Sequence, residues 1–324
     1  MLLGYHLLWS KTADIVGSEE QAERFNKLVV ENNYYIGGAV NPRDNDLQIT
    51  PGEQTITFNG FKHFTTGAAV SDLLVLEGAV PTGEHIFAAV PTAQAGITFD
   101  FNWDNIGLRL TESGSAKIEN VQAPWADALG WDAETKKPSA YLLETQYPTL
   151  LLPTIQLVFS NFYLGIALGA LDTARGYTVK TTRAWPYGGE NKEKGTDEFY
   201  VLERYGNLYA HLRAAEALAN EVGRAEDAIY DKYGNNRAGL TARERGDFAE
   251  QVASIKVVST DVGLRVTSAI FEVTGARATA GKVGLDRFWR DIRTHTLHDP
   301  VAYKNKELGR YFLLDEIPTP TWYT

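Results

Sequence analysis

The sequence of 324 residues has no cysteine, and its only methionine is residue 1. The lack of cysteine excludes disulfides, thiolate metal sites and a cysteine nucleophile. It is also typical of proteins from a reducing compartment, where disulfides are rare. We therefore expect a cytoplasmic protein.

Basic residues are outnumbered by acidic ones, 31 to 41, which gives a formal net charge of −10. Nucleic-acid binding is not expected, because phosphate backbones are bound by basic patches. No uninterrupted apolar run reaches the roughly 18 residues that a membrane-spanning helix needs. We therefore expect no membrane association, although a single phosphate could still be bound by local arginines.

The first segment, residues 1–36, is predicted to be helical. Ser18 is followed three residues later by Gln21, which is the spacing of a capping box at a helix start. Phe25, Leu28 and Val29 then recur at helical spacing. The segment therefore predicts a helix that begins after Ser18, preceded by another helical stretch.

Residues 37–125 have the alternation and turn residues of β-structure. Asn59-Gly60 lies between the alternating runs 55–58 and 61–64, which predicts a β-hairpin. The other predicted strands are Leu73–Leu76, His85–Val90, Ile97–Phe99 and Ala116–Val121. Short strands separated by Gly and Pro turns predict a small antiparallel barrel or sandwich.

Residues 126–324 begin with a linker and then become helical. A run at 155–174 is apolar on nearly every face, and an amphipathic run follows at 198–231. Thr241 and Glu244 form a second capping box, and Gly275 is expected to end that helix. With a shorter helix at 285–296, the fold class is α+β: a β domain followed by a bundle of about four helices.

The densest polar cluster contains His295 and His298, followed by Asp299 and Pro300. Two histidines three residues apart share a helix face, and imidazoles transfer protons near neutral pH. Asp299 could tune a histidine or act as a base. The alternative is an ordinary helix C-terminus, where histidine favours the dipole and proline ends the helix. The pair has too few ligands for a metal site, and no metal is predicted.

Two further segments could face a ligand. His63-Phe-Thr-Thr-Gly67 combines hydroxyls with a glycine that lets a backbone approach a flat ligand closely. Asn41-Pro-Arg-Asp44 is a turn that could shape a ligand-facing loop. The alternatives are an ordinary strand end, since threonine is common in strands, and an ordinary loop.

Arg183 and Arg277 follow two long predicted helices and are candidate phosphate ligands. A guanidinium can bond two phosphate oxygens at once. Solvated or C-capping arginines are the alternative for each. The glycine-rich loops of Rossmann and P-loop proteins are absent from the sequence, and so is a serine-hydrolase nucleophile elbow.

Together these strings resemble the acyl-CoA dehydrogenase superfamily, and within it the flavin-dependent monooxygenase branch that contains the dibenzothiophene monooxygenases. The resemblance covers almost the whole chain, and its most specific string runs from Arg293 to Pro300. The other strings include Gly4-Tyr-His-Leu7, Asn59-Gly-Phe-Lys-His-Phe64, Ile106-Gly-Leu-Arg109, Ser113-Gly-Ser115, Gly169-Ala-Leu-Asp172, Gly275-Ala-Arg277 and Asp286-Arg-Phe-Trp-Arg290.

The resemblance implies an acyl-CoA dehydrogenase-like fold and a two-component monooxygenase. Reduced FMN would come from a separate flavin reductase, with FAD the less expected cofactor. Its C4a-hydroperoxide, formed with O2, would oxygenate a thiophene-like sulfur compound or a similar small aromatic substrate. A homotetramer is also implied.

The resemblance also implies roles for individual residues. Thr66 would contact the reactive edge of the flavin, where relatives carry serine, and His295 and His298 would line the active site as catalytic residues, with His298 also contacting the cofactor. The other cofactor contacts would be Asn41, Trp103, Arg183 and Arg277, the arginines in part from a neighbouring subunit. His6 and Trp103 would line the substrate pocket.

This sequence departs from the family pattern in two places. Family members carry further N-terminal helices before the stretch that matches Gly4-Tyr-His, so most of that helical domain is expected to be missing. Asp299 stands where many acyl-CoA dehydrogenases keep a catalytic glutamate. The alternatives are thus a dehydrogenase-like flavoenzyme with Asp299 as base and a truncated, non-catalytic bundle protein.

Overall fold

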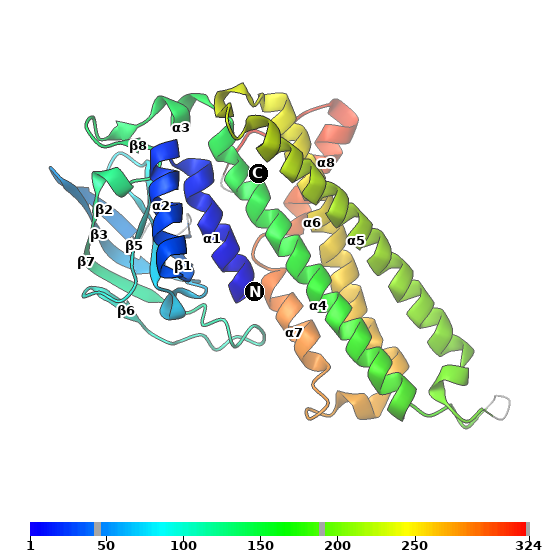
Figure 1. The fold of residues 1–324 in the computed structure, drawn as a ribbon. Coiled ribbons are helices and arrows are strands. Elements are labelled where there is room, and N and C mark those ends of the chain that lie inside the picture. The colour runs from blue at the N-terminus through cyan, green and yellow to red at the C-terminus, as the bar shows by residue number, and fades with distance from the viewer. Residues whose placement is uncertain (42–46, 188–191, 322–324) are drawn as a thin grey trace.

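The computed structural model describes residues 1–41, 47–187 and 192–321, and it places a curled β-sheet beside a bundle of long helices (Figure 1). Two N-terminal helices, α1 (Leu2–Val16) and α2 (Glu19–Asn32), precede the sheet. Helix α1 contacts both the first strand and the first long bundle helix, so it joins the two halves. The expected fold class is confirmed.

The main sheet has seven strands. They are β1 (Ile36–Ala39), β2 (Leu47–Pro51), β3 (Thr55–Lys62), β4 (Leu73–Ala79), β5 (His85–Pro91), β6 (Ile97–Phe99) and β7 (Ala116–Pro124). Strand β4 pairs antiparallel with β5 along one edge and parallel with β1 and β2 along the other. The expectation of an antiparallel sheet is therefore wrong: the sheet is mixed, because the chain crosses back to β4 after the β2–β3 hairpin.

The predicted hairpin at Asn59-Gly60 is wrong, since β3 runs straight through both residues. Its register with β7 shifts between Phe58 and Gly60, and Asn120 on β7 adopts a left-handed conformation with φ 55°. The side-chain oxygen of Asn59 accepts a hydrogen bond from the Asn120 amide at 2.8 Å. The Asn-Gly pair thus serves a β-bulge, because pairing with β7 outweighs its local preference for a turn.

Three helix ends were correctly predicted from caps. Ser18 accepts a hydrogen bond from the Gln21 amide at 3.1 Å, and Thr241 accepts one from the Glu244 amide at 3.2 Å. Gly275, with φ 83°, ends the helix that Thr241 begins. Among the described residues the helices after the sheet are α3 (Ala140–Glu144), α4 (Leu151–Thr181), α5 (Phe199–Tyr233), α6 (Ala242–Thr274), α7 (Asp286–His295) and α8 (Val301–Leu314).

Helix α8, which the sequence analysis did not predict, packs against α6. The bundle thus has three long and two shorter helices among the described residues, instead of about four. A small two-stranded ladder, β8 (Trp131–Asp132) with β9 (Lys137–Pro138), connects the sheet to the bundle.

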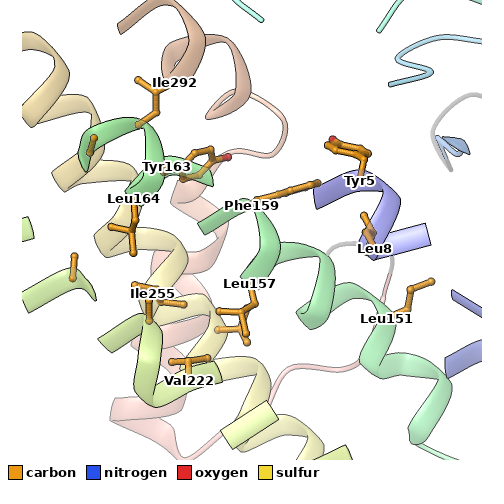
Figure 2. Packing of buried hydrophobic residues seen from close by; sticks show 14 of the residues in the cluster. Tyr5, Leu8, Leu151, Leu157, Phe159, Tyr163, Leu164, Val222, Ile255 and Ile292 are labelled. Carbon is orange, nitrogen blue, oxygen red and sulfur yellow. The ribbon is translucent and has the colours of Figure 1, made fainter. Parts of the chain in front are cut away.

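Strand β4 separates two hydrophobic cores. Leu73 and Val75 face the core that includes α1 and the bundle, part of which Figure 2 shows. Leu74 and Leu76 face the other core, inside the curled sheet. A strand buried on both faces has a continuous apolar sequence, as this one does.

Within the part of the chain that the structure describes, one helical stretch, Tyr147–Thr181, is apolar and long enough to cross a membrane by length and composition. It contains α4, whose side chains pack against α1, α5 and α6. Burial against other helices accounts for its apolar character, as in the core helix of a soluble protein.

Glu250 lies in α6 and is buried, with 3% of its surface exposed. Neither carboxylate oxygen accepts a hydrogen bond from the described part of the chain. Burial, together with the charge of Glu307, raises the pKa of this carboxyl to about 7. A buried, unpaired carboxylate therefore costs stability when it ionises.

Because the folded-state pKa of Glu250 lies above the ordinary value of 4.5, the folded protein binds this proton more tightly than the unfolded chain. Its stabilising effect is complete below pH 4.5 and is lost as pH rises through about 7. The free energy of unfolding of the wild-type protein should fall by about 1–3 kcal/mol over that pH interval. We predict that Glu250→Gln removes this fall. Denaturant unfolding at several pH values would measure it, with exposed Glu203→Gln as control. Parallel stability curves for all three proteins would contradict the prediction.

Candidate active site

The centre of the candidate site is His295, the last residue of α7, which is buried. The hydroxyl of Tyr5, from α1, lies 3.3 Å from its Nε2. The hydroxyl of Tyr163, from α4, lies 3.0 Å from its Nδ1. Figure 2 shows Tyr5 and Tyr163 on either side of Phe159. Both nitrogens of the imidazole are thus held by phenols from two other helices.

Aromatic rings surround the two histidines. The rings of His295 and His298 are nearly parallel, with centroids 5.8 Å apart and an interplanar angle of 14°. The Phe159 ring meets both edge-on, at 4.5 Å from His295 and 4.9 Å from His298. Phe162 lies 5.7 Å from His295 on another side. The two predicted histidines therefore lie side by side among aromatic rings, although α7 ends at His295 and His298 lies in the turn that follows.

These surroundings keep His295 neutral. Burial lowers the pKa of its imidazole well below the usual range, and the nearby His298 and Lys256 lower it further. A neutral imidazole has one donor nitrogen and one acceptor nitrogen. His295 can therefore donate one hydrogen bond and accept another within this site.

A buried ion pair lies behind the histidines. The ammonium group of Lys256, on α6, donates to Asp299 Oδ1 at 3.0 Å and to the Tyr163 hydroxyl at 3.2 Å. Asp299 also lies 3.2 Å from His298 Nδ1. Burial acts to raise the pKa of Asp299, but His298 and Lys256 hold it well below the usual range. A carboxylate so held is a weak proton acceptor, which disfavours Asp299 as the base of a dehydrogenase.

The turn after β3 and the loop before β7 together supply a row of hydroxyl groups. Thr66 Oγ1 lies 2.8 Å from Ser113 Oγ, which lies 2.7 Å from Thr111 Oγ1. Thr111 in turn donates to the carbonyl of Leu108 at 2.8 Å. Gly67, with φ 71°, turns the chain tightly beside Thr66. The hydroxyls are therefore held in place by one another and by the backbone.

The Thr66 end of this hydroxyl row lies beside Tyr5, the phenol that reaches His295. Burial raises the pKa of the Tyr5 hydroxyl, and a hydrogen bond with Thr66 partly offsets that rise. The same hydroxyl lies 3.3 Å from His295. The structure therefore brings Thr66, His295 and His298, which were singled out from the sequence, into one site.

Trp103 lies at the rim of this site. Its indole N–H donates to the Leu108 carbonyl at 2.9 Å, and its ring meets the Phe64 ring edge-on at 6.2 Å. The Phe64 ring is largely exposed and Trp103 partly so. Two aromatic rings thus line an open edge near Thr66.

The loop that carries Trp103 is attached to α7. The Leu108 amide donates to Asp291 Oδ1 at 2.7 Å, and Arg290 donates to the Ile106 carbonyl at 3.0 Å. Gly107 packs directly on the Arg290 backbone, where a Cβ would overlap the carbonyl group. The loop therefore couples the sheet to the helix that ends in His295.

We predict that Gly107→Ala separates the loop from α7, because the added methyl cannot fit against the Arg290 carbonyl. The free energy of unfolding should fall by about 1–3 kcal/mol, and the intrinsic fluorescence of Trp103 should change. Gly165→Ala, where the new Cβ meets no atom within 4 Å among the described residues, is the matched control. Equal stability of the two variants would disprove this packing.

Arg183 and Arg277 lie together, away from the histidines. Arg277 donates to the carbonyl of Thr181, the last residue of α4, and Arg183 follows two residues later. Thr181 is 181 − 163 = 18 residues beyond Tyr163, or about 27 Å along the helix at 1.5 Å per residue. The two arginines therefore cannot reach the His295 region of their own chain.

His6 and Asn41 each form a hydrogen bond that involves the backbone, His6 through its side chain and Asn41 through its own carbonyl group. His6 Nδ1 accepts a hydrogen bond from the Ile36 amide at 3.1 Å, and its ring stacks on Tyr35 at 5.1 Å. The Asn41 carbonyl accepts one from the Lys62 ammonium at 2.9 Å. Residues 42–46, which hold the rest of the Asn41-Pro-Arg-Asp44 turn, lie outside the described residues. His6 thus anchors β1, and its neighbour Tyr5 is the residue that reaches His295.

Four residues of this site were missed in the sequence analysis: Tyr5, Phe159, Tyr163 and Lys256. Tyr5 lies inside a string that was quoted only for its histidine. Lys256 carried a usable signal, since it is the only charged residue in the stretch 251–260 of this helix. Buried lysines are rare unless paired, so this lysine could have indicated a buried acidic partner.

Comparisons with known proteins agree with this geometry. Residues 157–302 match the family model of the acyl-CoA dehydrogenase C-terminal domain. The dibenzothiophene monooxygenase of Mycolicibacterium goodii is 41% identical over 98% of this chain and 77% of its own length. A probable FMNH2-dependent monooxygenase of Pseudomonas putida, SfnC, is 34% identical over 100% of this chain and 79% of its own.

The solved structure of FMN-bound TdsC from a Paenibacillus species superposes with a TM-score of 0.89. It is 36% identical over 100% of this chain and 81% of its own. Sheet and bundle together define an acyl-CoA dehydrogenase-like protein. Within that class, the chain belongs to the family of flavin-dependent monooxygenases that includes the dibenzothiophene monooxygenases.

Proposed function

We propose that this chain is an FMN-dependent monooxygenase that oxygenates the sulfur of a small, thiophene-like compound. The observation that carries the proposal is that His295, His298 and Tyr5 meet at one site, with the Thr66 hydroxyl close to Tyr5. The relatives support the chemistry, since they are named as dibenzothiophene and FMNH2-dependent monooxygenases. Reduced flavin would supply two electrons, so that one atom of O2 goes to sulfur and the other leaves as water.

The residues at the site fit a flavin ring. The edge of that ring carries hydrogen-bond donors and acceptors, and the Thr66 hydroxyl can act as either. The ring is flat and aromatic, and Phe64 and Trp103 offer aromatic surface beside Thr66. Asn41 would border the ring from the loop that follows β1. The donor set and the open aromatic edge therefore match what a flavin ring requires.

The chain's own residues would bind and orient the reactants and exclude water. Phe159 and Phe162 keep the His295 side of the site apolar, which strengthens hydrogen bonds made there. His295 would donate or accept at Nε2, and the neighbouring His298 would contact the cofactor from the solvent side. His6 and Trp103 would face the substrate. These are the roles that a water-sensitive oxygenation demands.

We further propose that the flavin phosphate is held by Arg183 and Arg277 of a neighbouring subunit in a homotetramer. The distance along α4 prevents the same chain from supplying them. Large aromatic side chains beside Arg183 are exposed, with Trp185 at 63%, Tyr187 at 73% and Phe199 at 77%. Exposed apolar groups of this size favour a protein–protein interface. A flavin reductase in the cytoplasm would be the transient partner.

We predict that His295→Ala with His298→Ala lowers sulfoxide formation by at least about 100-fold, the usual effect of removing acid–base groups. The assay would contain FMN, a flavin reductase and dibenzothiophene. FMN binding, followed by fluorescence quenching, should change far less. Exposed His211→Ala on α5 is the matched control. Undiminished turnover in the double variant would refute the roles given to the pair.

The shared site predicts complementation between inactive variants. His295→Ala and the double variant Arg183→Ala with Arg277→Ala should each be inactive, the latter through weakened FMN binding. Random mixing of their subunits would combine an intact histidine pair with intact arginines in roughly a quarter of the sites. Activity should therefore return after mixed refolding. Mixtures that stay inactive, although they form hybrid oligomers, would show that each site belongs to one chain.

A further inference from the structure

We propose that Asp299 is a positioning residue that accepts a hydrogen bond from Nδ1 of His298, so that Nε2 of the neutral ring is left as a proton acceptor. Lys256 holds Asp299 in that role. No part in the proposed oxygenation has been given above to Lys256 or Asp299. The hydrogen bonds are a property of this chain, and only their consequence for catalysis rests on the proposed monooxygenase function.

The two histidines of the site differ in what their ring nitrogens contact. Both nitrogens of His295 lie beside phenols, those of Tyr5 and Tyr163, and the residue is 6% exposed. The side chain of His298 is 44% exposed. Its Nδ1 lies 3.2 Å from Asp299 Oδ1, while its Nε2 has no hydrogen-bond partner within the described residues. His298 is therefore the histidine whose Nε2 can exchange a proton with a reactant or with water.

One oxygen of Asp299 serves two donors. Besides His298, the oxygen Oδ1 contacts the ammonium group of Lys256 at 3.0 Å, and the Lys256 side chain is fully buried. A carboxyl group beside an ammonium group ionises, and the pKa of Asp299 is held well below its usual range. An ionised carboxylate can only accept hydrogen bonds, so His298 Nδ1 must carry the proton that it donates.

A proton on Asp299 would not give a better arrangement. If the proton moved from Lys256 to Oδ1, the new hydroxyl would donate back to the amine, and Oδ1 would still accept from His298. If Oδ1 donated to His298 while Lys256 stayed charged, the buried ammonium group would lose its counter-charge, which is costly. The contacts of Asp299 thus place the proton of the neutral His298 ring on Nδ1.

Lys256 keeps the carboxylate of Asp299 in place. Its ammonium group also donates to the Tyr163 hydroxyl at 3.2 Å, and it lies 5.5 Å from the centre of the Phe159 ring. Lys256 on α6 therefore connects α4 to the segment that follows α7. A buried carboxylate held in this way against Nδ1–H fixes both the tautomer and the orientation of an imidazole.

For the proposed reaction, the consequence is a proton acceptor beside a neutral, buried imidazole. The rings of His295 and His298 are nearly parallel, with centroids 5.8 Å apart. His298 would take a proton from a reacting group at Nε2 and release it to water. In the opposite tautomer Nε2 already carries a proton and cannot accept one. Asp299 and Lys256 contact neither substrate nor cofactor and act through His298.

The test is ¹⁵N NMR of histidine-labelled protein without flavin, at about pH 9, where an ordinary imidazole is neutral. The two ring-nitrogen shifts report the tautomer, and the His298 signals among the six histidines are assigned by their loss in His298→Gln. Wild type should show Nδ1 protonated. Lys256→Met combined with Asp299→Leu replaces the ion pair by apolar side chains of similar size. This test variant should shift the tautomer ratio toward Nε2 by at least about tenfold, as expected for one hydrogen bond to a charged group.

The matched control is Lys304→Met combined with Glu307→Leu, which removes another buried lysine–carboxylate pair. Lys304 Nζ lies 2.8 Å from Glu307 Oε2 on α8, and its side chain is 4% exposed. The tautomer ratio of His298 in this control should equal that of wild type. His85, whose Nδ1 contacts the buried carboxylate of Glu77, serves as a reference in each spectrum and should be unchanged in both variants.

The oxygenation assay separates positioning from a merely structural role. The kcat for sulfoxide formation should fall about tenfold or more in the test variant, because the exposed nitrogen of His298 no longer accepts a proton. FMN binding, followed by fluorescence quenching, should stay near that of wild type, and the control should keep its kcat. Loss of FMN binding together with an unaltered tautomer would show that the ion pair only supports the fold.

A wild-type His298 protonated on Nε2 would overturn the inference, and that measurement does not depend on the folding of any variant. So would an unaltered tautomer ratio in the test variant. If the NMR results are as expected but wild type forms no sulfoxide, the positioning role is supported and the proposed oxygenation is rejected. If wild type forms sulfoxide with the proton on Nε2, only the positioning role is rejected.

Discussion

The structure depends on a buried imidazole that is held from both sides. Tyr5 reaches His295 from α1 and Tyr163 reaches it from α4, so three helices meet at one side chain. A buried polar group must keep its hydrogen bonds, because water cannot replace them. The angle between the N-terminal helices and the bundle is therefore linked to the geometry of the ring that would do the chemistry.

The sheet takes part in the same site through two short segments. The Thr65–Gly67 turn follows β3 and presents a hydroxyl to Tyr5, while the loop around Gly107 is bonded to α7. Both segments are irregular, and each is held by hydrogen bonds to rigid elements on either side. Catalytic sites are often built this way, with loops positioned by a scaffold.

The two buried charged side chains of the site lie behind the histidines. Lys256 and Asp299 neutralise each other in the interior, and the pKa of Asp299 stays below its ordinary range. A paired buried charge is tolerated only with further hydrogen bonds, here to Tyr163 and His298. The pair adds little net charge to the cavity but orders the hydrogen bonds around it.

The sequence by itself determined the local features and the family. Capping boxes at Ser18 and Thr241, the end of α6 at Gly275 and the histidine spacing all depend on neighbours within four residues, so they could be read directly. Only the tertiary structure decided that β3 continues through Asn59-Gly60 and does not turn there. It also decided that Tyr5, and not His6, reaches His295 and that Lys256 pairs with Asp299. Those outcomes depend on contacts between residues far apart in the chain, whose energies outweigh local preference and leave no periodic signal.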